Sequence, residues 1–261
     1  LLVHSVNAAA SAAEVRPLFD HYARTRRVWA PDLPGFGASE RGDRAYTPRL
    51  MTDALLATLD AMQRDTKHWP DALAASLGCE FAARAAVEWP GALRSLALVS
   101  PTGFRGTRAF RGAAGSTRGV PAVYRVLRGP GWGGALFRQL TRPGVIRYFL
   151  ERTWGAKAID EDLWRHDVLT ARQPGAEFAP LHFLAANLFS ADVTTLYESL
   201  ALPVWMSHGV RGDFTDYRGK RVVEGRANWR FTVFPTGALP YFEVREAFIA
   251  AYDVFLAGLP D

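Results

Sequence analysis

Residues 73–79 read Leu-Ala-Ala-Ser-Leu-Gly-Cys, and this stretch decides the fold. A short apolar run at 71–75 ends at Ser76, and a helical pattern at 78–89 follows at once. A strand, a sharp turn at a serine and then a helix is the context of a nucleophile elbow, where small residues two positions before and after the serine let backbones approach closely. Ala74 and Gly78 meet that steric demand. A serine before a helix is also a common helix cap, so the stretch alone leaves both interpretations open.

The whole chain has the composition of an ordinary globular protein. Its 261 residues are 49% hydrophobic and 22% charged, which excludes long disorder, collagen-like structure and coiled coils. No apolar run approaches the roughly 20 residues that a membrane-spanning helix needs. The single cysteine, Cys79, excludes an internal disulfide framework and a thiolate zinc cluster. One cysteine and no visible targeting signal favour a cytoplasmic location.

Apolar runs alternate with helical patterns over most of the chain. We expect strands at the start of the chain around His4 and at 27–30, 71–75, 95–100, 203–207 and 230–234, and helices at 47–62, 78–89 and 242–256. Strands separated by helices indicate an α/β fold with a mostly parallel central sheet flanked by helices.

Between residues 102 and 202 this alternation stops. No clear strand pattern occurs there, and helical pieces are expected at 123–127, 136–140, 145–154, 161–170 and 181–200. We therefore predict a core made of residues 1–101 and 203–261, with a helical cap inserted at 102–202.

Three further motifs flank Ser76 in a fixed order. His4-Ser5-Val6-Asn7 lies near the start, the loop Asp-Leu-Pro-Gly-Phe-Gly-Ala-Ser occupies 32–39, and the strand at 203–207 leads to Asp213. With these motifs in this order, residues 1–258 resemble the α/β-hydrolase fold family. The resemblance implies that Ser76 is a catalytic nucleophile and that the backbone amides of Val6 and Leu77 form an oxyanion hole. Ser5 stands where that family usually has glycine, and His4 is expected to stabilise the loop rather than to act in catalysis.

The same resemblance makes the first residues unusual. Members of the family carry a two-stranded hairpin before the strand that holds His4, whereas this chain opens Leu1-Leu2-Val3-His4 without an initiator Met. We therefore expect that the first N-terminal hairpin is missing and that the true N-terminus is not seen.

The sequence offers a residue for the acid of a catalytic triad but no histidine at the usual position of the base. The resemblance assigns the acid to Asp213, with Asp216 as the nearby alternative. The family's base is a histidine in the loop after the last strand, and this chain has Ala238 at that position. No histidine follows His208, so His208 is the candidate substitute base, against the simpler role of a loop histidine bonded to backbone. Tyr241 is a weaker candidate, because an unperturbed phenol is protonated near neutral pH.

Three interpretations of Ala238 remain open. It is an engineered replacement of a catalytic histidine, a natural residue whose role is taken by His208 or a substrate atom, or the mark of a degenerate triad in a non-catalytic protein. The first two predict a serine-type hydrolase that cleaves an ester or related acyl bond of a small to medium apolar molecule. The resemblance also covers serine enzymes that cleave carbon–carbon bonds. The third predicts a ligand-binding or scaffolding protein.

Cofactors and metals are not expected. The remaining histidines lack carboxylate or cysteine partners at metal-ligand spacing, and residues 129–134, GPGWGG, do not follow a strand as a phosphate loop would.

The net charge of +5 is concentrated in the predicted cap, where the only acid between Pro101 and Arg152 is Glu151. A solvated helix face is the default explanation of this charge. Weak docking on an anionic membrane surface and steering of an acidic substrate are the alternatives. Nucleic acid is not an expected partner, because no known binding module surrounds the arginines.

Overall fold

The computed structural model describes residues 1–129 and 132–260. Five strands form a sheet in the order β1-β2-β3-β4-β5, and each neighbouring pair is parallel. The strands are β1 (Leu2–Val3), β2 (Asp71–Ala75), β3 (Ser95–Val99), β4 (Val204–His208) and β5 (Trp229–Val233). Because all of them run in one direction, their carboxyl ends meet at a single edge, where ligands bind in open α/β sheets.

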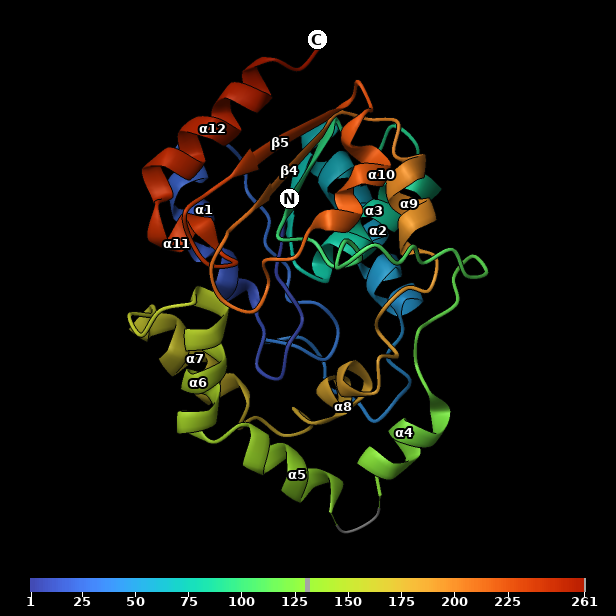
Figure 1. Cartoon of the computed structure of the whole chain (residues 1–261), viewed down its shortest axis with the longest axis vertical. Coiled ribbons are helices and arrows are strands. Elements are labelled where there is room, and N and C mark those ends of the chain that lie inside the picture. Colours follow the sequence, from blue (N-terminus) through green and yellow to red (C-terminus); the bar gives the residue numbers. More distant parts are fainter. Residues whose placement is uncertain (130–131, 261) are drawn as a thin grey trace.

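Helices cover both faces of this sheet (Figure 1). One face carries α1 (Arg16–Tyr22), α11 (Pro240–Glu243) and α12 (Arg245–Ala257), and the other carries α2 (Pro48–Thr66), α3 (Gly78–Glu88), α9 (Val193–Ser199) and α10 (Arg221–Glu224). Beyond the carboxyl edge lie α4 (Pro121–Leu127), α5 (Gly133–Leu140), α6 (Pro143–Trp154), α7 (Glu161–Thr170) and α8 (Phe178–Leu184). Two short 3₁₀ helices are η1 (Ala12–Val15) and η2 (Arg218–Lys220).

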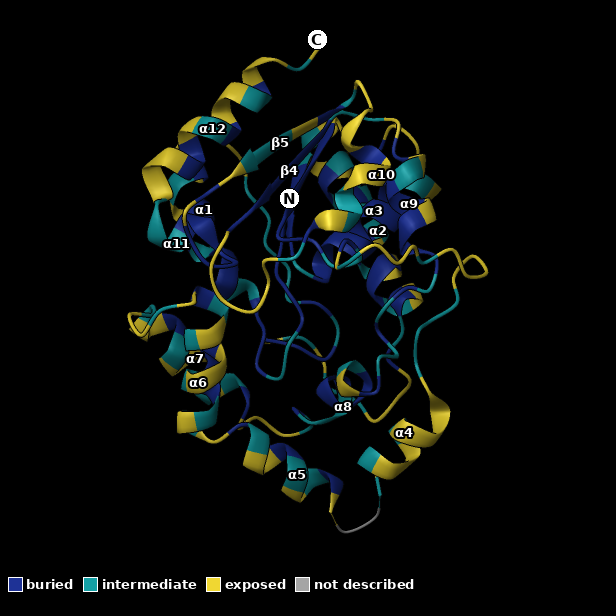
Figure 2. Ribbon diagram, viewed as in Figure 1, coloured by how far each residue is buried: buried dark blue, intermediate teal, exposed yellow. Residues whose placement is uncertain are grey.

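The strands are apolar throughout because both of their faces are buried. In β2, Ala72 and Ala74 belong to the core beneath α2 and α3, whereas Leu73 and Ala75 belong to the core beneath α12. Alternate side chains of a strand point to opposite faces, so a doubly covered strand needs apolar residues at every position. Figure 2 shows the resulting buried centre under an exposed outer shell. The predicted α/β fold class is confirmed.

Three predicted elements differ from the structure. Residues 27–30 form no strand: the Leu2 amide donates to the Trp29 carbonyl at 2.8 Å, but Pro31 follows and has no N–H with which to continue a ladder. The single helix expected at 181–200 is two helices, α8 and α9, because Ala186 adopts a left-handed conformation with φ of 60° and ends the first. The last helix begins at Arg245, after the separate α11.

The loop at 32–39 is held by its first residue. Asp32 accepts hydrogen bonds from the Ala12 amide and the Ala38 amide, both at 2.7 Å. Gly37 has φ of +52°, and a Cβ there would lie 2.0 Å from the Asp32 carboxyl carbon. Glycine is therefore required at this turn, and the loop is fixed beside the carboxyl edge of the sheet.

Among the helices that the structure describes, none is both long enough and apolar enough to cross a membrane.

Candidate active site

Ser76 occupies a sharp turn between β2 and α3. Its φ is +50°, a left-handed conformation that is uncommon outside glycine and costs on the order of 1–3 kcal/mol. The Ser76 amide donates to the Val99 carbonyl at 2.8 Å, and α3 begins two residues later at Gly78. The half-buried serine therefore stands at the carboxyl edge of the sheet, in front of a helix N-terminus that favours developing negative charge.

Gly78 allows the start of α3 to touch the loop after β1. A Cβ at this position would lie 2.4 Å from the His4 carbonyl oxygen and 3.2 Å from a Val3 methyl group. The first distance is shorter than real Cβ contacts allow and the second is tight, so the close approach depends on glycine. The sequence requirement for a small residue here thus has a defined steric cause.

Gly78→Ala is expected to lower the free energy of unfolding by about 1–3 kcal/mol, because the new methyl group pushes the His4 carbonyl and its loop away. Gly144→Ala is the matched control, since Gly144 is also helical and a Cβ there meets nothing within 4 Å. The control is expected to be neutral or stabilising by up to about 1 kcal/mol. Urea denaturation of both variants measures the difference, and equal midpoints would contradict the steric argument.

The loop after β1 lies beside Ser76. Leu2 pairs with Leu73 and Val3 with Ala74, so the residues that follow Val3 run alongside the end of β2. The His4 Nε2 atom accepts from the Leu33 amide at 2.9 Å, and Nδ1 lies 2.5 Å from the Ser5 carbonyl oxygen, to which it donates. Burial lowers the pKa of His4, so the ring is neutral. Both ring nitrogens are occupied, which leaves His4 a structural part of the loop.

Glu14 organises this loop, and sequence reasoning missed it. Its buried carboxylate accepts from the Ser5 amide at 2.8 Å and from the Asn7 side-chain amide at 2.7 Å. The signal in the sequence was a lone acid within an otherwise uncharged stretch from Val6 to Val15. Ser5 is not among the residues with positive φ, which explains why serine fits where related loops carry glycine.

Two backbone amides, one in the loop after β1 and one directly after Ser76, have no acceptor among the described residues. Within residues 1–129 and 132–260, the amides of Val6 and Leu77 donate to no protein group. Unsatisfied amides beside a half-buried serine are suited to receive a developing oxyanion.

In the part of the chain that the structure describes, neither acid candidate forms a hydrogen bond or an ion pair with a histidine. Asp213 forms a two-pronged ion pair with Arg152, with both nitrogen–oxygen distances at 2.5 Å, and its amide donates to the Arg152 carbonyl at 3.1 Å. Asp216 pairs instead with Arg218 and accepts from the Gly106 amide at 3.1 Å. The Arg218 guanidinium holds the pKa of Asp216 well below its usual range.

Ala238 lies in the same neighbourhood as Asp213 and Ser76. Its amide donates to the carbonyl of Thr153, the residue after the partner of Asp213, at 2.9 Å. Its carbonyl accepts from the Ser100 hydroxyl at 2.7 Å. Ser100 follows β3 and stands beside Ser76, because Ala75 and Val99 are paired in register and each serine comes next. The loop of Ala238 therefore passes over the edge of the sheet next to the candidate nucleophile.

His208 is buried at the end of β4. Its Nδ1 lies 2.8 Å from the Gly209 carbonyl and donates to it, while Nε2 has no partner in the described part of the chain. The ring stacks on Tyr217 with centroids 4.1 Å apart, and burial lowers the pKa of His208. It is therefore a neutral imidazole with a free lone pair. However, β3 separates β4 from β2, which puts His208 about 10 Å from Ser76 across the strands.

Tyr241 does not fit the role of a base. Its side chain is fully buried, its hydroxyl has no hydrogen-bond partner among the described residues, and burial raises its pKa well above the usual value. The phenol is therefore protonated at neutral pH.

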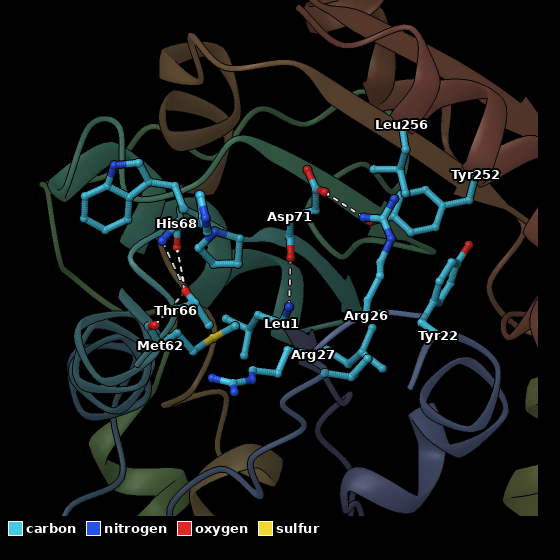
Figure 3. A pocket seen from close by; sticks show the side chains of 14 residues that line it. Leu1, Tyr22, Arg26, Arg27, Met62, Thr66, His68, Asp71, Tyr252 and Leu256 are labelled. Carbon is cyan, nitrogen blue, oxygen red and sulfur yellow. Dashed lines mark hydrogen bonds and ion pairs between the residues drawn. The ribbon is translucent and has the colours of Figure 1, made fainter. Parts of the chain in front are cut away.

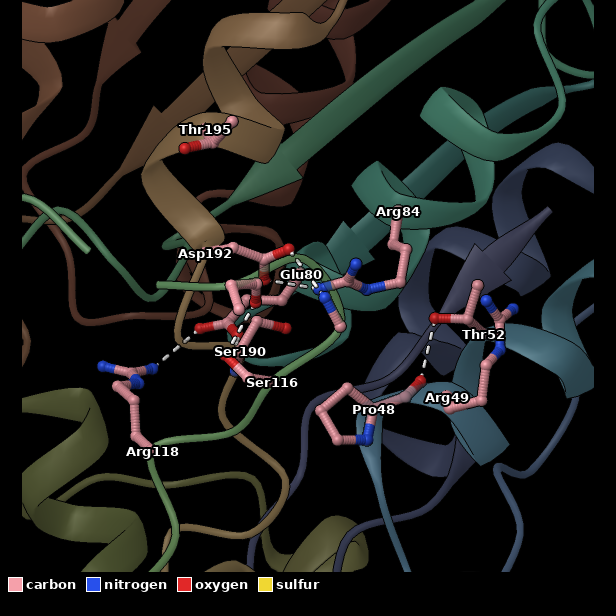
Figure 4. A network of polar contacts seen from close by, with 12 residues as sticks. Pro48, Arg49, Thr52, Glu80, Arg84, Ser116, Arg118, Ser190, Asp192 and Thr195 are labelled. Carbon is pink, nitrogen blue, oxygen red and sulfur yellow. Dashed lines mark hydrogen bonds and ion pairs between the residues drawn. The ribbon is translucent and has the colours of Figure 1, made fainter. Parts of the chain in front are cut away.

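A buried polar network ties the segment 102–202 to α3 (Figure 4). Glu80, one turn after Ser76, accepts from the Thr102 hydroxyl at 2.6 Å and from the Arg118 guanidinium at 3.0 Å. Burial raises the pKa of Glu80, and the positive charge of Arg118 opposes this shift. Nearby, Arg84 forms a buried ion pair with Asp192 at 2.6 Å. Both ends of the segment are thus attached to the helix that positions Ser76.

The cavity in Figure 3 is not this site. It has a volume of about 320 Å³ and is lined by residues at the amino ends of the strands, including Leu1 and Asp71. Ser76 is at the other end of β2. Within the described ranges, no group of three or more His, Cys, Asp or Glu side chains is arranged to hold a metal ion.

Comparisons with known proteins point to one protein family. A family model described as "Alpha/beta hydrolase family" matches residues 1–251. The chain is 31% identical over 105 residues to the 2-hydroxymuconate semialdehyde hydrolase of Pseudomonas sp. (strain CF600). That alignment covers 40% of this chain and 36% of the relative, so it spans little more than a third of the relative's length.

Solved structures share the fold over nearly the whole chain. A 2-hydroxy-6-oxo-6-phenylhexa-2,4-dienoate hydrolase from Rhodococcus sp. strain RHA1 superposes with a TM-score of 0.74 at 17% identity, covering 98% of this chain and 89% of the other. A thermophilic esterase from Thermogutta terrifontis superposes with a TM-score of 0.72 at 18% identity, covering 99% and 89%. With the family model matched across the sheet and its helices, this chain belongs to the alpha/beta hydrolase family.

Proposed function

We propose that this chain is a serine-type hydrolase that cleaves an ester or related acyl bond of a small to medium apolar molecule. The observation that carries the proposal is the left-handed Ser76 between β2 and α3, with the free amides of Val6 and Leu77 beside it. Ser76 is the nucleophile, Asp213 is the acid, and the two amides bind the oxyanion. Residues 102–202 form a helical cap over this edge of the sheet.

In this reaction the Ser76 oxygen attacks the carbonyl carbon of the substrate, and the tetrahedral oxyanion is held by the two amides. Collapse expels the leaving group and leaves an acyl-serine ester. Water then attacks that ester, releasing the acid and returning the proton to Ser76. Both halves need a group that accepts and returns a proton, and Ala238 has none to offer. We therefore expect the chain as it stands to be slow.

His208 is the residue that we propose as a substitute base, acting through the lone pair on Nε2. Its separation from Ser76 means that a water or a substrate atom has to carry the proton between them. A substrate with its own basic group near the scissile bond would need no such relay.

Carbon–carbon bond hydrolysis is the second candidate, favoured by the 2-hydroxymuconate semialdehyde hydrolase relative. There the bond broken joins the carbonyl carbon to another carbon, water supplies the hydroxyl of the acid, and a proton goes to the leaving carbon. The same serine and oxyanion amides would serve.

The proposal is tested by measuring hydrolysis of a panel of substrates in an assay sensitive enough to detect slow turnover. Nitrophenyl esters of increasing acyl length are compared with a 2-hydroxy-6-oxo-dienoate over long incubations. Turnover of esters with a preference for longer acyl chains supports the esterase proposal, and turnover of the dienoate alone supports the second candidate. No turnover, together with saturable binding of these compounds, would favour a ligand-binding protein with a degenerate triad.

A further inference from the structure

Helix α4 exposes an apolar stripe. Val123 and Val126 on the helix are 43% and 58% exposed, Val120 just before it is 51% exposed, and the helix has no buried residue. Figure 2 shows α4 as a largely exposed helix at the margin of the molecule. A helix of seven residues is not stable alone in water, and here it rests on α8 through Tyr124, which stacks on His182 at 4.0 Å. The valines face away from that contact, towards solvent.

An arginine and a tryptophan accompany the exposed valines of α4. Arg125 is exposed and has no ion-pair partner in the described ranges, whereas Arg128 is already paired with Asp43. Trp132, which packs on Gly129 just after α4, is 45% exposed. A hollow of about 540 Å³ opens beside the helix and is lined by Tyr124, Arg125 and Asn187, among others. Its amide and guanidinium groups can donate hydrogen bonds to phosphate oxygens.

The positive charge of the α4 surface indicates which kind of partner it binds. A second copy of the chain would bring unpaired arginines against each other, which like-charge repulsion opposes. An anionic phospholipid bilayer supplies both an apolar layer for the valines and phosphates for the arginines. Tryptophan at the boundary fits as well, because indoles favour the headgroup region.

We propose that α4 docks this protein on an anionic phospholipid bilayer, with Val123, Val126 and Trp132 in the boundary between headgroups and acyl chains. Arg125 then contacts lipid phosphates. Binding of this kind is peripheral and reversible, since it uses one short amphipathic surface. It does not depend on which bond the serine site cleaves.

Flotation with lipid vesicles tests the proposal on the full chain. Vesicles of phosphatidylcholine containing about one-third phosphatidylglycerol are compared with pure phosphatidylcholine vesicles at low and high salt. We expect flotation with the anionic vesicles only, and its loss at high salt. The double variant Val123→Ser, Val126→Ser is expected to weaken binding roughly tenfold or more, and Arg125→Gln roughly fivefold.

Matched controls lie on α12, at the opposite end of the molecule in Figure 1. Val254 is 74% exposed and Arg245 is exposed, so Val254→Ser and Arg245→Gln make the same chemical changes away from α4. Both are expected to float like the unmodified chain. Three results would overturn the proposal: no flotation with anionic vesicles at low salt, flotation that the α4 variants do not weaken, or a concentration-dependent dimer that the valine variant abolishes.

Discussion

Ala238→His is expected to raise esterase turnover by roughly a thousandfold or more, the largest gain that any single substitution in this chain should give. A positioned imidazole removes the proton of the serine as it attacks, and in serine hydrolases the loss of such a base costs several powers of ten. The position is suitable because Ala238 is held between Thr153 and Ser100, and Ser100 stands next to Ser76. Hydrolysis of a nitrophenyl ester by the variant, with rates compared under saturating substrate, measures the gain.

The pH dependence of that variant identifies its new base. The imidazole acts only when neutral, so activity should fall as the pH drops below its pKa, which is about 6.5 for an unperturbed ring. An ion pair with Asp213 would raise this pKa and move the fall to higher pH. The unmodified chain should show its fall at lower pH, because its proposed base is His208, whose pKa is lowered by burial.

The ion pair of Asp213 should limit the gain in turnover that Ala238→His gives. Arg152 now holds this carboxylate, so a new histidine competes with an existing ion pair. Adding Arg152→Gln to Ala238→His should therefore raise the rate further, because it frees Asp213 to orient the ring.

Two controls separate a base from other effects of the substitution. Ala238→Asn introduces a polar side chain without a base, and Ala227→His adds an imidazole at an exposed position. Neither should gain activity. If folded Ala238→His shows no more turnover than these controls, the assignment of position 238 as that of a lost base is wrong.

The sequence predicts well what depends on local pattern. The strand at 71–75 and the helix that follows Ser76 are marked by an apolar run, a serine and small residues, and these local features decide where the chain turns. The prediction of a strand at 27–30 was wrong because strand pairing depends on a neighbouring strand and is interrupted here by Pro31. The prediction of one helix at 181–200 was wrong because nothing in the sequence marks Ala186 as left-handed.

Contacts across long separations explain why the site was less predictable than the fold. Arg152 and Asp213 are 61 positions apart, and the sequence near Asp213 does not indicate that it will form an ion pair with an arginine of α6. Glu14 is likewise near the start of the chain but acts by fixing Ser5 and Asn7 next to Ser76. Residue type and order identify the nucleophile candidate, but pairing among distant charges is decided only when the sheet brings its edges together.

Ser76→Ala is expected to abolish covalent labelling by a fluorophosphonate probe, and to remove all of the activity that Ala238→His confers. The probe reports an activated serine directly, whatever the natural substrate is. Labelling is best measured in the Ala238→His background, where the base should make it fast, and the modified peptide is identified by mass spectrometry. Removing the nucleophile deletes the acyl-enzyme route itself, so the loss should equal the whole gain, roughly a thousandfold or more.

Ser100→Ala is the matched control for this experiment, because few residues resemble Ser76 so closely. Ser100 also follows a strand, has φ of +48° against +50° for Ser76, and is its neighbour in register. Its hydroxyl, however, is already committed to the Ala238 carbonyl. We expect labelling to persist in Ser100→Ala, with a modest change in rate from the loosened loop. Labelling that survives Ser76→Ala, or that maps to Ser100, would show that the nucleophile is assigned to the wrong strand. Absence of labelling even with a histidine at position 238 would instead mean that Ser76 is not activated and that the pocket serves binding.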